Sequence, residues 1–574
     1  MIVTPQEQID AYTRLGAWGT DTWIDWFLRN VEAAPDALAL VDPPNRPDMG
    51  MGPARRLTYR ETAQLVDRLA CALLDAGITQ DDVVMIQLPN VVELIIAYLA
   101  VARIGAILSP LPVQFRTHEL KYTLNLAAPK AFITTRSFDK FDYLGMVQGL
   151  QKDFPSLRTI IACGADLPAS VVSLDEILSR PHDPAQLEAY LKAHTLTAND
   201  VVTICWTSGT EAEPKGVPRS HNLWFSIAYT TVDAAELSHG CALLNPFPMV
   251  NMSGIGGMLA PWLLTGGKLV MHHPLNLPVF LAQVKAESIE YTVAPPVLLN
   301  LLLLKPALLE QADLSSIRVI GSGSAPLTTW MTTQWKEKFG IEVLNFFGSN
   351  EGVAMVSAPR EIPDPAERAR VFPRYGVEGF SWSNRSTIGY STRLIDPLTG
   401  REIADPGRPG EMVIKGPTVF SGYFRRPDLS EKAFDTDGYF HTGDLFSIEP
   451  GADGQLSRYR AVGRLKDVII RGGTNISPEE LEVLIADHPK VADVCVVGYV
   501  DGRALGEEQI CVVAVPRPDQ QVTLSDIHDL LKSKDIAQFK MPKKLWLVEA
   551  LPRNPVGKVL KRDLRDQLNH EFEA

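Results

Sequence analysis

Residues 201–217 read VVTICWTSGTEAEPKGV. The apolar, β-branched run Val201–Trp206 predicts a buried strand, and the hydroxyls, glycines and lysine after it predict a loop at the carboxyl end of that strand. Backbone N–H groups and hydroxyls can surround phosphate oxygens in such a loop, with Lys215 as a point charge. The loop is not a Walker A motif, because Lys215 precedes Gly216 and no helix-opening Thr follows. We expect a phosphate site here, with a plain surface turn as the alternative.

Strands and helices alternate on both sides of this loop. Thr58 and Glu61 have the spacing of a capping box, and Gly77 is placed to end the helix that follows it. A buried strand at Val83–Ile86 and a helix over about 91–104 come next. This rhythm predicts an α/β fold with two layers of parallel type, each covered by helices. Further strands are predicted at Lys268–Met271, Tyr291–Ala294, Arg318–Gly321 and Val343–Phe346.

The pattern of apolar and turn residues changes twice toward the C-terminus. Short alternating apolar runs and turn residues in 386–465 predict a β-rich subdomain, a small barrel or sandwich. The last segment, 466–574, is long enough for a separate small α+β domain, and Ser477–Glu480 predicts a helix start with Pro at its first position. We therefore divide the chain into an N-terminal body, 1–465, and a C-terminal domain, 466–574. The body comprises α/β subdomains 1–195 and 196–385 and the β-rich subdomain 386–465.

Composition and charge exclude several classes of protein. The chain has 574 residues, 45% hydrophobic and 21% charged, which argues against disorder and against a coiled coil. Lys and Arg number 55 against 68 Asp and Glu, a net charge of −13. Because phosphate surfaces attract basic patches, this balance argues against a nucleic-acid binder and an anionic-membrane binder. A local site can still hold a small anionic ligand.

The sequence predicts no membrane span and a cytoplasmic location. The longest apolar stretch, Leu94–Ala102, is shorter than the about 20 residues that a span needs and is expected to be a buried helix. Leu298–Leu304 is likewise expected in the core. Residues 1–10 show no basic segment followed by an apolar one. The six cysteines lack CxxC spacing, so we expect them to be reduced core residues.

Three other segments suit a nucleotide. Residues 346–352 read FFGSNEG after a predicted strand, where open α/β sheets place ligands; an aromatic ring can stack on a base and a carboxylate can hold Mg²⁺. Thr442–Asp444 places an acid where it suits a ribose diol. Lys558 stands on a tight turn after Gly557. Taken singly, each segment has an ordinary alternative: a core aromatic, a turn and a surface lysine.

In this order the segments resemble the adenylate-forming superfamily, which comprises acyl-CoA synthetases, aryl-CoA ligases, luciferases and peptide-synthetase adenylation domains. The resemblance covers nearly the whole chain, from about Thr22 to Leu568. It implies a large N-terminal body and a small mobile C-terminal domain. The most specific segments are 207–217, 439–445 (YFHTGDL), 463–467 (GRLKD) and 552–558 (PRNPVGK).

The resemblance implies an ATP site. Asp444 is expected to bind both ribose hydroxyls, Arg464 to contact the ribose or a phosphate, and Phe347 to stack on adenine. Glu351 is the expected Mg²⁺ ligand and one of two catalytic residues. The other nucleotide-binding residues are expected in the phosphate loop, beside adenine and the acyl group, and before the metal ligand: Thr207, Ser208, Gly209, Thr210 and Lys215; Gly323, Ser324, Ala325 and Pro326; Gly348 and Asn350.

The resemblance also assigns roles near the C-terminus. Lys558, the second catalytic residue, is expected to bridge the substrate carboxylate and the α-phosphate. Mg²⁺ and Lys558 would offset the repulsion between these two anions. Lys466 is expected at the hinge, with a plain surface lysine as the alternative. Gly472 and Gly473 resemble the glycines of the pantetheine tunnel, and domain rotation would bring them to the site in place of Lys558.

The sequence departs from the family pattern at several positions. Glu211 and Ala212 replace a hydroxyl and a glycine in the phosphate loop, and Glu211 either helps hold Mg²⁺ or faces water. Asn350 stands where Thr is usual. Residues 360–385 form a long charged connection, which is a lid, an oligomer contact or a solvated loop.

The acid pocket is predicted from mostly apolar or small side chains. Val250 and Asn251 replace an aromatic residue and a His, which suggests a roomier or differently shaped pocket. No cation is placed for a second carboxylate and no acid for an ammonium, so a hydrophobic monocarboxylic acid fits best: fatty, alicyclic, aromatic or a sterol side chain. The predicted pocket residues are Met249, Asn251, Ser253, Gly254, Ser349 and Val353.

These expectations combine into one activity. The chain is expected to be an ATP-dependent acid–CoA ligase of fatty acid metabolism that uses ATP, Mg²⁺ and coenzyme A. It would form an acyl-AMP with release of pyrophosphate and then a thioester with release of AMP. An adenylating enzyme that loads a separate carrier protein and a catalytically silent ligand-binding relative are the alternatives. The expected partners are the small-molecule acid, ATP and CoA, without nucleic acid, and a homodimer is left open.

Overall fold

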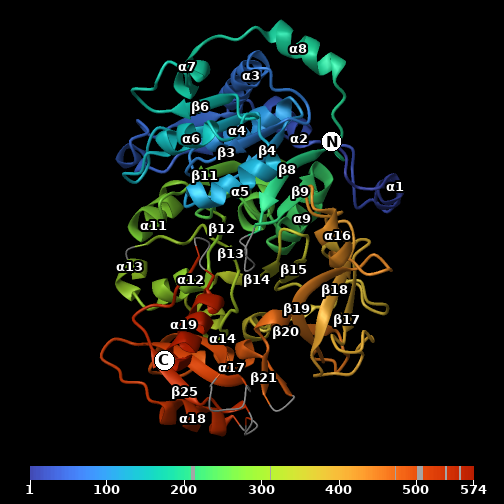
Figure 1. Ribbon diagram of the computed structural model, residues 1–574, viewed down its shortest axis with the longest axis vertical. Helices are drawn as coiled ribbons and strands as arrows, with labels where there is room; N and C mark the ends of the chain where they lie inside the picture. Colours follow the sequence, from blue (N-terminus) through green and yellow to red (C-terminus); the bar gives the residue numbers. More distant parts are fainter. Residues whose placement is uncertain are drawn as a thin grey trace.

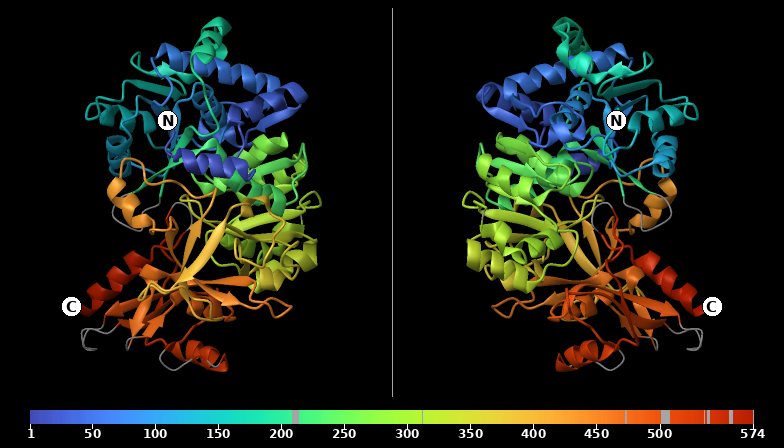
Figure 2. Two further views of the ribbon diagram at one scale, coloured as in Figure 1. Left: turned by 90° about the vertical axis from the view of Figure 1, so that its right-hand side faces the viewer. Right: turned by 90° about the vertical axis from the view of Figure 1, so that its left-hand side faces the viewer.

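The computed structural model covers residues 1–574 and describes 1–207, 214–310, 312–471, 474–500, 508–534, 536, 540–554 and 558–573. Two large sheets form an N-terminal body, a five-stranded sheet packs on its flank, and a small C-terminal region lies at the far end (Figure 1). Figure 2 shows the same order from two sides. The predicted α/β class with a large N-terminal and a small C-terminal part is confirmed.

The first large sheet has seven strands and is parallel except for the pair β8–β9. The predicted strands at 83–86 and 201–206 are confirmed, as is the helix predicted over 91–104, which is α4 (Val92–Arg103). Every residue of α4 from Val92 to Ala102 is buried, which is why its sequence is apolar all round. In spatial order the strands are β7 (Val172–Ser173), β6 (Thr159–Cys163), β5 (Ala131–Thr135), β3 (Val83–Ile86), β4 (Ile107–Pro110), β8 (Val201–Trp206) and β9 (Gly216–Ser220).

The second large sheet has eight strands, with antiparallel pairs only at its two ends. The largest hydrophobic core joins both sheets through α4, α9 (His221–Ala234) and α10 (Ala260–Thr265). In spatial order the strands are β15 (Ala354–Ser357), β14 (Glu342–Gly348), β13 (Val319–Gly323), β12 (Tyr291–Val293), β10 (Ala242–Asn245), β11 (Lys268–Met271), β1 (Leu38–Val41) and β2 (Arg56–Thr58).

Sheet membership differs from the predicted division at 195/196. β1 and β2 lie early in the chain but complete the second sheet, because β1 pairs in parallel with β11. β8 and β9 lie after residue 200 but complete the first sheet, because β8 pairs in parallel with β4. Apolar periodicity indicates that a strand is buried, but it does not identify the strand with which it pairs. The exchange of strands between the two sheets was therefore not predictable. The boundary at 465/466 stays a prediction.

The β-rich subdomain is an antiparallel five-stranded sheet. Its edge strand β16 lies inside the connection 360–385, so the interpretation of that connection as a solvated loop is wrong for its centre. Arg368, which ends the short helix α15 (Pro365–Arg368), is fully buried and donates to the carbonyls of Ile362 and Pro363. In spatial order the strands are β16 (Val371–Pro373), β20 (Arg458–Arg464), β19 (Phe440–Glu449), β18 (Gly410–Lys415) and β17 (Ser391–Ile395).

In the described part of the C-terminal region, three helices pack against two small sheets. The helix starts where predicted: Ser477 accepts a hydrogen bond from the N–H of Glu480, and the Glu480 carboxylate pairs with Lys540. The strands and helices are β21 (Ile469–Arg471), β22 (Thr474–Ile476), β23 (Val491–Val500), β24 (Glu508–Pro516), β25 (Lys544–Leu547), α17 (Pro478–Ala486), α18 (Leu524–Ser533) and α19 (Lys561–Glu573).

Other local predictions are confirmed. Thr58 and Glu61 form the capping box of α3 (Tyr59–Asp75), with both reciprocal hydrogen bonds present. Gly77 has φ +75°, the left-handed conformation that a glycine adopts at little cost after a helix. All six cysteines are buried thiols, as expected for reduced core residues.

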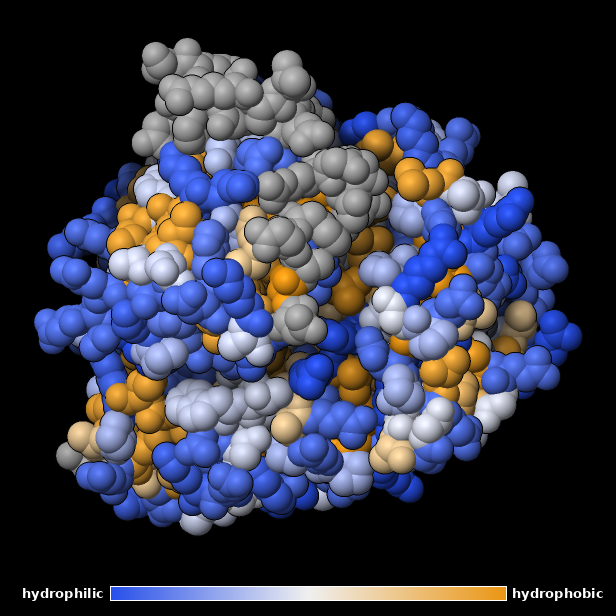
Figure 3. Space-filling model, turned by 90° about the horizontal axis from the view of Figure 1, so that it is seen from below, coloured by the Kyte–Doolittle hydropathy of each residue, from blue (hydrophilic) through white to orange (hydrophobic). Residues whose placement is uncertain are grey.

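The remaining helices surround these sheets. In α12 (Pro296–Leu303) the prediction of a core segment is partly wrong, since Leu298, Leu299 and Leu302 are buried but Leu301 is 37% exposed. Among the described residues no helix is long and apolar enough to cross a bilayer. The face in Figure 3 is mostly hydrophilic, with separate apolar patches. The other helical segments are α1 (Gln6–Arg14), α2 (Trp23–Ala33), η1 (Arg46–Met49), α5 (Thr117–Ala127), α6 (Tyr143–Gln151), α7 (Leu174–Ser179), α8 (Pro184–Ala193), η2 (Met252–Leu259, a π-helix), α11 (Leu277–Ala286), α13 (Pro306–Glu310), α14 (Thr329–Phe339), η3 (Arg385–Thr387), α16 (Pro427–Ala433) and η4 (Leu465–Asp467).

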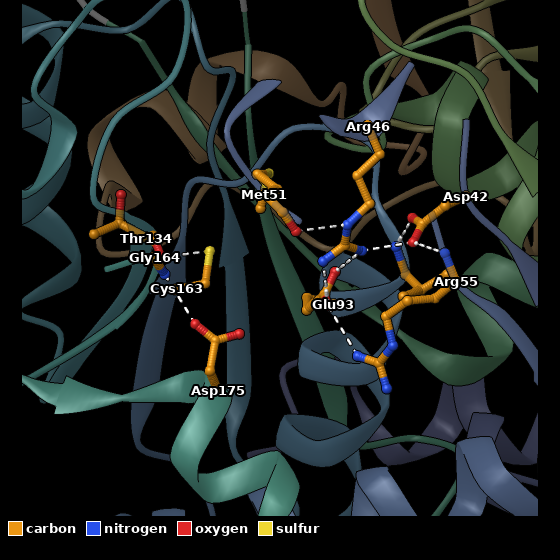
Figure 4. A network of polar contacts seen from close by, with 10 residues as sticks. Asp42, Arg46, Met51, Arg55, Glu93, Thr134, Cys163, Gly164 and Asp175 are labelled. Carbon is orange, nitrogen blue, oxygen red and sulfur yellow. Dashed lines mark hydrogen bonds and ion pairs between the residues drawn. The ribbon is translucent and has the colours of Figure 1, made fainter. Parts of the chain in front are cut away.

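A buried ion network connects the second sheet to α4 (Figure 4). Glu93, in the first turn of α4, accepts two hydrogen bonds from Arg46, at 2.7 and 2.8 Å, and one from Arg55, at 2.9 Å. Asp42 also pairs with Arg46 and accepts from the N–H of Val92. Burial alone would raise the pKa of Glu93, but the hydrogen bonds and charge of Arg46 hold it below its ordinary value. The carboxylate is therefore charged in the folded protein.

Glu93→Gln is expected to lower the free energy of unfolding by about 3 kcal/mol, because breaking a buried ion pair leaves the arginines without their counter-charge. Urea unfolding followed by tryptophan fluorescence measures this change. Glu176→Gln, which removes the exposed pair of Arg180 with Glu176, is the matched control and is expected to leave the unfolding midpoint unchanged. Equal midpoints for the two variants would contradict a stabilising role of the network.

Candidate active site

The predicted nucleotide-binding residues that the structure describes lie where three sheets meet. β8 of the first sheet and β13 and β14 of the second sheet bring them there at their carboxyl ends, and β19 and β20 of the five-stranded sheet bring Asp444 and Arg464. The carboxyl ends of parallel strands are where open α/β sheets bind ligands. The loop 417–424, between β18 and α16, closes the site from the side of the five-stranded sheet.

Residues 349–352, between β14 and β15, form a turn that we call the glutamate turn. The carboxylate of Glu351 accepts a hydrogen bond from the hydroxyl of Tyr423 at 3.1 Å. Asn350 accepts from the N–H of Met252 at 3.0 Å and donates to the carbonyl of Trp206 at 3.3 Å. The turn therefore contacts the end of β8, the π-helix that carries predicted pocket residues, and the loop 417–424.

The phosphate loop is described at its two ends. The N–H of Thr207 donates to the carbonyl of Lys215, and the N–H of Lys215 donates to the hydroxyl of Thr207, both at 3.0 Å. These bonds close the base of the loop. The ammonium of Lys215 lies 5.2 Å from the ring centre of Tyr423, the residue that contacts Glu351. Ser208, Gly209, Thr210, Glu211 and Ala212 lie outside the described residues.

Asp444, Arg464 and Lys558 form one cluster of charges. The register of β19 and β20 places Asp444 opposite Arg464, and the guanidinium Nε lies 2.9 Å from the carboxylate. The N–H of Lys558 donates to the side chain of Asn554 at 2.9 Å. Its ammonium lies close enough to exchange charge effects with both Asp444 and Arg464. The charge of the C-terminal lysine therefore acts on two residues of the N-terminal body.

The environment shifts the pKa values of Asp444 and Lys558 toward neutral pH. Burial raises the pKa of Asp444 to about 6, although Arg464 and Lys558 act to lower it, and Glu351 adds to the rise. Burial also lowers the pKa of Lys558 to about 8, together with the charge of Arg464, while Asp444 opposes this change. Neighbouring ionisable groups of opposite charge whose pKa values are shifted are typical of functional sites.

The end of β13 approaches β14 closely at the predicted adenine surface. A Cβ at Gly323 would lie 2.5 Å from the carbonyl oxygen of Phe346, so this approach requires glycine. The next residue, Ser324, has φ +70°, and Ser324, Ala325 and Pro326 are exposed. Phe347 is half-buried with its ring against Phe446, and Gly348 is exposed beside it. An open backbone edge next to an aromatic ring suits a planar base.

The predicted pocket residues differ in their exposure. Met249 and Val353 are fully buried, and Val353 packs in the core of the five-stranded sheet. Asn251 caps the π-helix by accepting from the N–H groups of Ser253 and Gly254, and Asn251 and Ser253 are half-buried. The hydroxyl of Ser349 is buried without a hydrogen-bond partner in the described structure. Their role as walls of an acid pocket stays a prediction.

The predicted hinge lies in the short helix η4, directly after β20. Lys466 is exposed there, and its charge acts on Lys558. The hydroxyl of Ser477 donates to the carbonyl of Val462, across this connection. Gly472 and Gly473 lie outside the described residues. Hinge and tunnel roles therefore stay predictions.

Two residues at this site were not singled out from the sequence. Tyr423 contacts Glu351, and nothing in the segment GYFRR distinguishes it from a core aromatic. Arg219, on β9, donates to the carbonyl of Asn350. The sequence could have indicated Arg219, because it is a charged residue within the predominantly uncharged segment Gly216–Ser220, which is buried in the structure.

Two family models match the chain. The model described as AMP-binding enzyme matches residues 27–424, and the one described as AMP-binding enzyme C-terminal domain matches residues 480–558. Together they include most of the residues described above.

Individual relatives span nearly the full length. The chain is 29% identical to the medium-chain fatty-acid–CoA ligase of Escherichia coli K12, over 97% of this chain and 92% of that protein. It is 26% identical to the 2,3-dihydroxybenzoate-AMP ligase of Bacillus subtilis 168, over 99% and 98%. Among solved structures, ATP-bound MatB from Rhodopseudomonas palustris matches with a TM-score of 0.78 and 26% identity, over 96% of this chain and 99% of that chain.

Proposed function

This chain belongs to the AMP-binding enzyme family, and from that premise we propose that it is an ATP-dependent acid–CoA ligase. It activates a hydrophobic carboxylic acid as acyl-AMP and then transfers the acyl group to the thiol of CoA. One observation carries the proposal: buried Asp444 pairs with half-buried Arg464, and the charges of half-buried Lys558 and of Glu351 act on the same carboxylate.

The residues present fit a nucleotide with Mg²⁺. Mg²⁺ binds through one or two carboxylates together with substrate phosphates. Glu351 offers such a carboxylate, since Tyr423 contacts one of its oxygens and no described residue donates to the other. When bound, Mg²⁺ would neutralise phosphate charge as pyrophosphate leaves. Asp444 would accept from the ribose hydroxyls, and Lys215 would hold phosphate oxygens.

Lys558 would act on the reacting atoms. The acid must approach an α-phosphate that is already anionic, and an ammonium between the two reduces their repulsion and stabilises the charge of the transition state. The carboxylate oxygen bonds to the α-phosphorus, and the bond to the bridging oxygen breaks with its electrons going to pyrophosphate. In the second step the CoA thiolate attacks the acyl carbon and AMP leaves. The proton of the thiol goes to solvent or to AMP.

The acid and the acceptor are the least constrained parts of the proposal. The relatives named above act on a medium-chain fatty acid and on an aromatic acid, which supports a hydrophobic monocarboxylic acid. The second of them is named as an AMP ligase, which favours an adenylating enzyme that loads a carrier protein as the second candidate. A cytoplasmic location and a homodimer stay predictions.

A pyrophosphate-release screen tests the proposal. The full-length protein is given ATP, Mg²⁺ and a panel of fatty, alicyclic, aromatic and sterol-side-chain acids, with and without CoA. Release of AMP and a thioester product in the presence of CoA is expected for at least one acid. Release of pyrophosphate without a CoA thioester, but with acylation of a carrier protein, would replace the first candidate by the second. If no acid caused release of pyrophosphate, the result would support a catalytically silent ligand-binding relative.

The pH dependence of kcat/KM for pyrophosphate release is expected to be bell-shaped, with limbs near pH 6 and pH 8. Below about pH 6 Asp444 gains a proton and loses acceptor capacity, since its pKa is raised to about 6. Above about pH 8 Lys558 loses the proton that carries its charge, since its pKa is lowered to about 8. kcat/KM reports these values for the free enzyme.

Thioester formation from supplied acyl-adenylate is the control, because Lys558 has no part in that half-reaction. The alkaline limb near pH 8 is expected to be missing there. An alkaline limb shared by both half-reactions would contradict its assignment to Lys558.

A further inference from the structure

Arg219 is a buried cation that has no ion-pair partner among the described residues. Its side chain is fully buried on β9, and in the part of the chain that the structure describes no carboxylate forms an ion pair with it. Burial lowers its pKa to about 9, opposed by the charge of Glu351. Burying an unpaired charge is costly, so a guanidinium in such a place needs a reason in the groups that it contacts.

The guanidinium contacts one carbonyl in each of three parts of the protein. Nη1 donates to Asn350 at 2.7 Å, and Nη2 donates to Leu223 and to Thr418, both at 2.9 Å. Leu223 is in α9 after the first sheet, Asn350 is in the glutamate turn of the second sheet, and Thr418 is in the loop 417–424 of the five-stranded sheet (Figure 1). The ring of Trp224 lies 4.8 Å from the guanidinium and covers it.

The glutamate turn depends on contacts of this kind. Three consecutive carbonyls in it accept bonds from outside: Asn350 from Arg219, Glu351 from the N–H of Phe420 at 2.9 Å, and Gly352 from the hydroxyl of Thr418 at 2.8 Å. Gly352 has φ +120°, and a Cβ there would lie 2.2 Å from the carbonyl oxygen of Thr418. The turn is thus held by its neighbours, and Arg219 is its contact to the strand that follows the phosphate loop.

We propose that Arg219 is a positioning residue for the glutamate turn. It fixes the backbone of Asn350 relative to β9, and through it the Glu351 carboxylate relative to the phosphate loop. The inference rests on the proposed function, because it concerns the metal ligand of the same site. Arg219 does not touch substrate; it acts through Asn350 and Glu351. A purely structural guanidinium that joins three sheets is the competing interpretation.

The two interpretations differ in how Mg²⁺ affects ATP binding. The full-length protein is titrated with ATP by calorimetry, without acid, in the presence and in the absence of Mg²⁺. The readout is the Kd without Mg²⁺ divided by the Kd with Mg²⁺, which we call the Mg²⁺ ratio. In Arg219→Met, which keeps the length and removes the donors, this ratio is expected to fall about 10-fold, the order of one charge-assisted hydrogen bond. ATP binding without Mg²⁺ is expected to stay near the wild-type value. Pyrophosphate release is expected to lose kcat with little change in KM for the acid.

Arg368→Met is the matched control. Arg368 is as deeply buried and donates to three backbone carbonyls, those of Val343, Ile362 and Pro363. It differs in pairing with Glu342, and no hydrogen bond joins it to the glutamate turn among the described residues. This variant is expected to lower the melting temperature and to leave the Mg²⁺ ratio unchanged. Arg219→Lys keeps the charge but cannot reach three carbonyls with one nitrogen, so an intermediate loss of the ratio is expected.

An unchanged Mg²⁺ ratio in Arg219→Met, with activity that falls only as the folded fraction falls, would overturn the inference. If Arg219→Met yields no folded protein, Arg219→Lys decides: a reduced ratio supports the inference and an unchanged ratio overturns it. Failure of the proposed function is separate, since the wild-type protein itself would then release no pyrophosphate with any acid.

Discussion

Lys558→Ala is expected to lower the rate of acid-dependent pyrophosphate release about 100- to 1000-fold, the order found when one donor to transition-state charge is removed. The structure gives the reason, because the charges of Asp444 and Arg464 act on the ammonium of half-buried Lys558. Without it, the acid and the α-phosphate approach each other with no positive charge between them. The measurement is pyrophosphate release with saturating ATP and a responsive acid.

The second half-reaction separates this role from a general defect. Thioester formation from supplied acyl-adenylate and CoA is expected to stay near the wild-type rate in Lys558→Ala, because in that step the new bond forms at the acyl carbon and not at an anionic phosphate. Lys532→Ala, which removes an exposed lysine of α18 in the same region, is the control and is expected to change neither rate. Equal losses in both half-reactions would refute this division of labour.

Asp444→Asn is expected to lower kcat/KM for ATP about 100-fold. A carboxylate that accepts from two ribose hydroxyls makes two charge-assisted hydrogen bonds, each worth about 1.5–3 kcal/mol, and an amide accepts only through its oxygen. Asn also leaves Arg464 without its 2.9 Å partner. Initial rates of pyrophosphate release across a range of ATP concentrations measure the loss.

Deoxynucleotides give the sharper form of this test. Wild-type protein is expected to use 2′-deoxy-ATP and 3′-deoxy-ATP less efficiently than ATP, and Asp444→Asn is expected to reduce that discrimination because the missing hydroxyls no longer have a charged acceptor. Asp437→Asn, at an exposed position of the same subdomain, is the control. Undiminished discrimination in Asp444→Asn would show that the ribose is recognised elsewhere.

Local structure was largely predictable. The strands at 83–86, 201–206 and 268–271 are found at the predicted bounds, and the helix predicted over 91–104 is α4. These segments can be recognised in the sequence, because a strand or helix that is buried on all sides requires an uninterrupted apolar run. The Thr58 capping box was predictable for a similar reason, since its bonds lie within four consecutive residues.

Contacts between distant segments were not predictable in the same way. Arg219 illustrates this, since its three acceptors come from α9, the glutamate turn and the loop 417–424. Arg368 illustrates it as well, because a charged connection gave the expectation of a solvated loop while its arginine is fully buried. A sequence shows that a residue is charged, whereas its burial depends on acceptors that the fold supplies.

The amino-acid sequence alone determined the α/β class, the order of the structural regions and the loops that carry hydroxyl, glycine, carboxylate and lysine groups, because each of these depends on residues close together in the chain. Tertiary structure alone decided that β1 and β2 join the second sheet, that Arg219 donates to the glutamate turn, and that the charges of Asp444 and Arg464 act on Lys558. The physical reason is that pairing of strand edges and shifts of pKa arise from neighbours in space. Those neighbours exist only once the chain has folded.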